Sequence, residues 1–120
     1  ACAAALGAIQ TIEEDKLVER ARHIGKILSE SLNALAAKHS IIGEVRGRGA
    51  MQAIELVEPG TTTPNPAAMA AIIKHCQSKG VLILTAGTYA NVIRFLPPIV
   101  ISDELLKDAL GVLEEAFASL

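Results

Sequence analysis

One cation stands out in the sequence, because Arg94 lies in the predominantly apolar stretch NVIRFLPPIV. Such a stretch is typical of a buried β-strand, in which Val92, Arg94 and Leu96 share one face. Arginine keeps its charge inside a protein, so burying it is unfavourable unless an anion is close. A guanidinium on a rigid strand can bind a carboxylate or a phosphate through two parallel hydrogen bonds. Arg94 is therefore our candidate for binding an anionic ligand.

A structural role for Arg94 fits the sequence equally well, as an ion pair with Glu44, Glu55 or a partner chain. Two more arginines, Arg46 and Arg48, lie in the segment VRGRG. This segment lacks the glycine spacing of a phosphate-binding loop, so we interpret it as a structural kink.

No other side chains have the pattern of a catalytic or metal site. A Schiff-base lysine needs a desolvated pocket, whereas every lysine here lies on a predicted helix or at a helix end among polar neighbours. These are Lys16, Lys26, Lys38, Lys74, Lys79 and Lys107. The histidines His23, His39 and His75 share no face for a metal ion, and no serine lies in a G-x-S-x-G turn. We expect no catalytic, cofactor-binding or metal-binding residue in this chain.

The composition favours one globular domain, with 120 residues of which 51% are hydrophobic and 20% charged. A net charge of -2, few aromatic residues and no basic run argue against nucleic-acid binding. Cys2 and Cys76 lack CxxC spacing and are expected to be free thiols of a cytoplasmic protein. The apolar start, ACAAALGAI, is too short to cross a membrane and lacks the basic residues of a signal peptide. Because the chain begins at Ala1, we expect a fragment.

The first half of the chain predicts a helix followed by two strands. Apolar residues recur about every 3.6 positions from residue 3 to residue 37, which indicates one long amphipathic helix. Residues 44–57 contain glycines and then a period-2 alternation, which predicts two strands around a kink.

The second half repeats the order helix, strand, strand and adds a final helix. Asn65 followed by proline is a helix cap, and the helix extends to about Lys79. Residues 81–87 and 91–96 are expected to pair as strands, and Ser102 caps the last helix. The buried stripe of this helix is expected to consist of Leu105, Leu106, Ala109, Leu113 and Phe117. The order αββαββα predicts an α+β fold, with a small antiparallel or mixed sheet covered by helices on one face.

Three segments carry a resemblance to a known family. The sequences EVRGRGAMQAIELV (44–57) and KGVLILTAGTYANVIRFLPPIVIS (79–102) resemble the C-terminal region of the class III, fold-type I, pyridoxal-phosphate-dependent aminotransferases. The opening ACAAALGAIQTIEEDKL is similar to a helix of the same family, so the resemblance covers essentially the whole chain. The motif AGTYANVIR (86–94) is typical of the branch of this family that uses 4-aminobutyrate.

The resemblance implies that residues 1–120 are the C-terminal small domain of a larger, homodimeric, cytoplasmic enzyme. Its large domain would hold pyridoxal 5'-phosphate, and no position here matches that domain's Schiff-base lysine, so the fragment alone is expected to be inactive. The parent enzyme would transfer the amino group of 4-aminobutyrate to 2-oxoglutarate, giving succinate semialdehyde and glutamate. Arg94 would bind the α-carboxylate of 2-oxoglutarate or glutamate, and a glutamate of the large domain would hold Arg94 aside in the other half-reaction.

Three other interpretations are kept. The chain could be a free-standing, non-catalytic α+β module that binds an anionic metabolite at Arg94. It could belong to a class III aminotransferase of the ornithine or acetylornithine type. The third interpretation is a domain that only mediates protein–protein interaction, because the alanine-rich N-terminal turn suits close packing against another helix. None of them involves a membrane or a nucleic acid.

Overall fold

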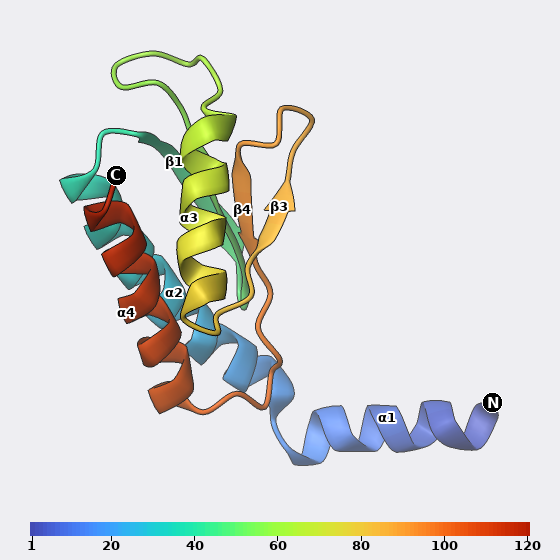
Figure 1. Ribbon diagram of the computed structural model, residues 1–120. Coiled ribbons are helices and arrows are strands. Elements are labelled where there is room, and N and C mark those ends of the chain that lie inside the picture. Colours follow the sequence, from blue (N-terminus) through green and yellow to red (C-terminus); the bar gives the residue numbers. More distant parts are fainter.

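Four helices and one four-stranded sheet make up the computed structural model, which describes residues 1–120 (Figure 1). The helices are α1 (Cys2–Glu14), α2 (Leu17–Lys38), α3 (Pro66–Ser78) and α4 (Asp103–Ala118). The strands are β1 (Ile42–Arg48), β2 (Met51–Leu56), β3 (Leu84–Ala86) and β4 (Val92–Phe95). All neighbouring strands are antiparallel, in the order β1-β2-β4-β3. The predicted α+β fold is confirmed.

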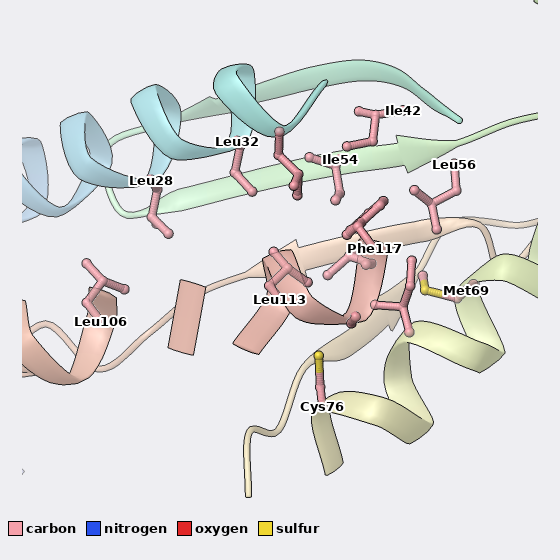
Figure 2. Close-up of a cluster of buried hydrophobic side chains, with 14 of the residues drawn as sticks. Leu28, Leu32, Ile42, Ile54, Leu56, Met69, Cys76, Leu106, Leu113 and Phe117 are labelled. Carbon is pink, nitrogen blue, oxygen red and sulfur yellow. The ribbon is translucent and has the colours of Figure 1, made fainter. Parts of the chain in front are cut away.

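The core lies between one face of the sheet, which we call the inner face, and helices α2, α3 and α4 (Figure 2). Ile54 of β2 and Ile93 of β4 are directly paired, and both are fully buried. The helices contribute Ile24, Leu28, Leu32, Met69, Ile72, Cys76, Leu106, Leu113 and Phe117. Helices therefore cover one face of the sheet, as the sequence predicts.

The chain begins with two helices where the sequence predicts one. Lys16 adopts a left-handed backbone conformation, with φ of 50°, and separates α1 from α2. Helix α1 contains no buried residue and projects away from the rest of the chain, which leaves Leu6, Ile9 and Ile12 exposed (Figure 1). The apolar period continues across the break, so the pattern gives no sign of a single left-handed residue. None of the four helices has the length and apolar character needed to cross a bilayer.

The predicted helix caps are confirmed, and one residue of the last helix is wrongly placed by the sequence. Asn65 Oδ1 accepts a hydrogen bond from the Ala68 amide at 2.9 Å, and Ser102 Oγ accepts one from the Leu105 amide at 3.2 Å. Leu105 was expected in the buried stripe of α4, yet it is 62% exposed while Leu106 is buried. Adjacent helical positions lie about 100° apart, and the packing of α4 selects the second leucine.

The β1–β2 hairpin packs closely on α2 at a contact between two glycines. A Cβ atom added to Gly25 of α2 would lie 2.3 Å from the carbonyl oxygen of Gly49 in the hairpin turn. Gly49 itself has φ of 55°, a conformation that favours glycine. Gly49 of the VRGRG segment thus acts in the hairpin turn, and Gly47 is paired with Gln52 inside β1, in agreement with the structural interpretation of that segment.

Candidate functional site

Arg94 lies on the sheet face opposite the core, which we call the outer face. The strand register aligns Arg46, Ala53, Arg94 and Leu84 in one row across β1, β2, β4 and β3. Cross-strand partners point to the same side of a sheet, so these four side chains share the outer face. The residue before Arg94, Ile93, points to the inner face and is fully buried.

Arg94 is exposed in this structure, so the expectation that it is buried among apolar side chains is wrong for this chain. Helices cover β4 only on the Ile93 side, and the apolar sequence around Arg94 could not show that one face stays open. The structure contains no hydrogen bond or ion pair from the Arg94 side chain. Glu44 and Glu55, the partners considered for it, both bind Arg46 instead. The guanidinium of Arg94 is therefore free of any carboxylate of this chain.

A three-residue ion cluster occupies the neighbouring part of the outer face. Arg46 Nη1 lies 2.6 Å from Glu44 Oε2 and 2.8 Å from Glu55 Oε2. Hydrogen bonding to Glu55 raises the pKa of Arg46, and the charges of both carboxylates act in the same direction. This cluster was not predicted. Alternating charged residues on two adjacent strands indicate a shared charged face, but the pairing also depends on the register of β1 against β2.

Asn91 links this cluster to the strand that carries Arg94. Its side chain is buried, and Nδ2 donates to the Leu56 carbonyl oxygen at 2.9 Å and to Glu55 Oε1 at 3.4 Å. The Leu56 amide donates to the Asn91 carbonyl oxygen at 2.7 Å. These bonds join the end of β2 to the start of β4, three residues before Arg94. This role of Asn91 was not predicted from the sequence.

A hollow of about 500 Å³ lies beside β4, and Arg94 contributes to its wall. The walls are mostly apolar and come from residues 79–84, from residues 94–98 and from α4. Lys79 and Asp108 are the other charged residues of the lining. The lining is otherwise mostly apolar, so the hollow suits a ligand with a hydrocarbon chain.

The titratable residues offer no catalytic centre. All six lysines are exposed on or beside helices, so none has the desolvated surroundings of a Schiff-base lysine. The residues of this chain therefore do not fit the attachment of pyridoxal phosphate. Cys2 and Cys76 are free thiols, and no three His, Cys, Asp or Glu side chains are grouped as metal ligands would be.

Comparison with protein families gives a match along almost the whole chain. The family described as aminotransferase class-III matches residues 1–117.

Curated relatives match the full chain at substantial identity. A 4-aminobutyrate aminotransferase of Mycobacterium tuberculosis is 48% identical over 120 residues, which is 100% of this chain and 27% of the relative. A 5-aminovalerate aminotransferase of Pseudomonas putida is 44% identical over 100% of this chain and 28% of its own length. The 4-aminobutyrate aminotransferase of Escherichia coli is 39% identical over 98% of this chain and 28% of its own. The chain thus spans little more than a quarter of the length of these relatives.

Solved structures share the fold. An aminotransferase of Bacillus anthracis matches 99% of this chain and 28% of its own, with a TM-score of 0.87 and 32% identity. A phospholyase from Arthrobacter, solved in complex with phosphoethanolamine, has a TM-score of 0.90 and 34% identity over 98% of this chain and 28% of its own. An acetylornithine aminotransferase from Elizabethkingia anophelis has a TM-score of 0.80 and 29% identity, over 99% of this chain and 30% of its own.

Proposed function

The chain belongs to the class III aminotransferase family, and we propose that residues 1–120 form the C-terminal small domain of an enzyme of this family. In this proposal the parent enzyme transfers the amino group of 4-aminobutyrate to 2-oxoglutarate, giving succinate semialdehyde and glutamate. The family implies pyridoxal 5'-phosphate in the parent enzyme, where the cofactor supplies an electron sink for the reacting carbon. Because no lysine of this chain fits its attachment, the cofactor would be held by the rest of the protein.

The observation that carries the proposal is the free guanidinium of Arg94 beside carboxylates that are already bound. Glu44 and Glu55 both bind Arg46, so Arg94 has no carboxylate partner in this structure and is available for one from a substrate. In 2-oxoglutarate one carboxylate is adjacent to the reacting carbonyl carbon, whereas 4-aminobutyrate has no carboxylate adjacent to the carbon that bears its amino group. A bidentate arginine can therefore recognise one substrate of the pair and stay unused with the other.

Arg94 would contribute binding and orientation. Its backbone belongs to a strand held on both sides, by β2 and by β3, so the sheet fixes the point from which the side chain extends. Fixing the α-carboxylate fixes the adjacent carbonyl carbon, and such orientation is a substantial source of rate enhancement. The homodimeric state and the cytoplasmic location of the parent enzyme stay predictions.

A second donor, 5-aminovalerate, is favoured by a specific observation, since an enzyme named for that substrate is 44% identical over the whole chain. The two donors differ by one methylene group, and an apolar pocket separates such substrates by about 1–3 kcal/mol. Steady-state kcat/KM for the two donors decides between them. The acceptor role of Arg94 is the same for both, because neither donor has an α-carboxylate.

The proposal is tested by Arg94→Lys in the full-length enzyme. A lysine keeps the charge and loses the planar fork, so kcat/KM for 2-oxoglutarate should fall roughly 10- to 100-fold. The half-reaction with 4-aminobutyrate should change little. A loss of transition-state stabilisation with 2-oxoglutarate below about 1 kcal/mol would contradict the assigned role.

A further inference from the structure

We propose that Arg46 is a positioning residue that keeps Glu55 from pairing with Arg94, so that Arg94 stays available for the substrate carboxylate. The inference rests on the proposed function of Arg94. It assigns a role in substrate binding to an arginine that does not itself touch the substrate.

Glu55 is the acidic residue of the sheet best placed to neutralise Arg94. In the register of β2 and β4, Ala53 is opposite Arg94 and Glu55 is opposite Val92. Glu55 and Arg94 are therefore diagonal neighbours on the outer face, and such positions lie about 7–8 Å apart, within reach of long side chains. Strands β2, β3 and β4 contain no other acidic residue.

Both carboxylate oxygens of Glu55 are bound by groups other than Arg94. Oε2 accepts from Arg46 Nη1 at 2.8 Å, and Oε1 accepts from Asn91 Nδ2 at 3.4 Å. Asn91 is itself fixed by its bond to the Leu56 carbonyl oxygen at 2.9 Å. Arg46 is the stronger of the two partners, because it supplies a positive charge and the shorter bond. It also binds Glu44 at 2.6 Å, which anchors its guanidinium on the β1 side of the sheet.

Removing the charge of Arg46 should release Glu55 toward Arg94. Glu55 would keep its negative charge and one weak bond to Asn91, and the free cation on the adjacent strand is Arg94. A Glu55–Arg94 pair would then have to break before 2-oxoglutarate could bind. The donor half-reaction would be spared, because 4-aminobutyrate has no α-carboxylate that needs Arg94.

The test is Arg46→Met in the full-length enzyme, with KM measured for both substrates. We expect KM for 2-oxoglutarate to rise about fivefold, the effect of one exposed ion pair competing with the ligand. KM for 4-aminobutyrate should stay within about twofold of the wild-type value. The matched control is Arg48→Met, because Arg48 lies on the same strand and the same face, opposite Met51, and makes no ion pair. This control should leave both KM values unchanged.

A second substitution separates competition by Glu55 from a general effect on the fold. Arg46→Met combined with Glu55→Gln removes the competing charge, so KM for 2-oxoglutarate should return to within about twofold of wild type. A merely structural role of Arg46 would give no such recovery. If Arg46→Met does not fold, Arg46→Gln asks the same question, since glutamine removes the charge but still donates hydrogen bonds.

The inference is overturned if the charge-removing variant leaves KM for 2-oxoglutarate unchanged, or if the double variant shows no recovery. Failure of the proposed function has a different signature, because Arg94→Lys would then leave kcat/KM for 2-oxoglutarate unaffected. A normal loss in Arg94→Lys together with an unchanged KM in Arg46→Met refutes the positioning role alone.

Discussion

Adjacent residues of β4 show how differently the two faces of this sheet are used. Ile93 is fully buried against the helices, whereas Arg94 is exposed on the face that no helix of this chain covers. The inner face is held together by apolar contact, which depends on how much surface is buried and has no preferred direction. The outer face is arranged by charges and register, and both are directional. Stability and ligand recognition thus come from opposite sides of the same strands.

The largest change in stability is expected from a substitution on the inner face. Ile93→Ala removes a buried side chain and leaves a cavity, so the stability of this region should fall by about 2–5 kcal/mol. An outer-face substitution such as Arg94→Lys should change stability by less than about 0.5 kcal/mol. Urea unfolding of the two full-length variants measures the difference. Equal destabilisation by both would break the comparison.

Asn91 should give an intermediate effect, because it connects the two faces. Asn91→Ala removes the side-chain hydrogen bond to the Leu56 carbonyl oxygen, which keeps its bond from the Asn65 amide at 3.1 Å, so stability should fall by about 0.5–1.5 kcal/mol. It also removes the weaker of the two partners of Glu55, so KM for 2-oxoglutarate should rise less than in Arg46→Met. Unfolding midpoints and KM values of the same variant check both statements. An unchanged midpoint would show that the β2–β4 junction does not depend on this side chain.

The smallest effect is expected at the edge of the helical layer, where α2 and α4 are joined by charges. Asp103 binds Arg20 at 2.7 Å and His23 at 2.6 Å. The hydrogen bond with His23 has the larger effect and the one with Arg20 the next, and both lower the pKa of Asp103. A carboxylate with a lowered folded-state pKa stabilises the protein above its ordinary pKa of about 4, and this contribution is lost as the pH falls through the lower, folded-state value. Asp103→Asn should therefore weaken the loss of stability between about pH 5 and pH 2. Unfolding midpoints measured across that pH range test this. If the variant loses as much stability at low pH as the wild type, the ion pairs of Asp103 do not cause the loss.

The sequence predicted the inner face better than the outer one, for a physical reason. In β2 the apolar residues Ile54 and Leu56 alternate with Ala53 and Glu55, so the covered face follows from the pattern. In β4 the residues on both sides of Arg94 are apolar, and only the packing of the helices decides which face is covered.

The contacts of Arg46 and the break at Lys16 were beyond the sequence for other reasons. The Arg46–Glu55 contact depends on the register of β1 against β2, and alternation alone leaves that register undefined. The break at Lys16 depends on the backbone conformation of one polar residue, which does not disturb the apolar period. The helix caps were predictable because Asn65 and Ser102 act through local hydrogen bonds.

The most direct measurement compares two amino acceptors in the full-length enzyme, 2-oxoglutarate and succinate semialdehyde, because only the first has a carboxylate next to its carbonyl carbon. The quantity is the ratio of their kcat/KM values in the wild type and in Arg94→Lys. If Arg94 binds the α-carboxylate, the ratio should fall roughly 10- to 100-fold in the variant. Equal changes for both acceptors would contradict the account.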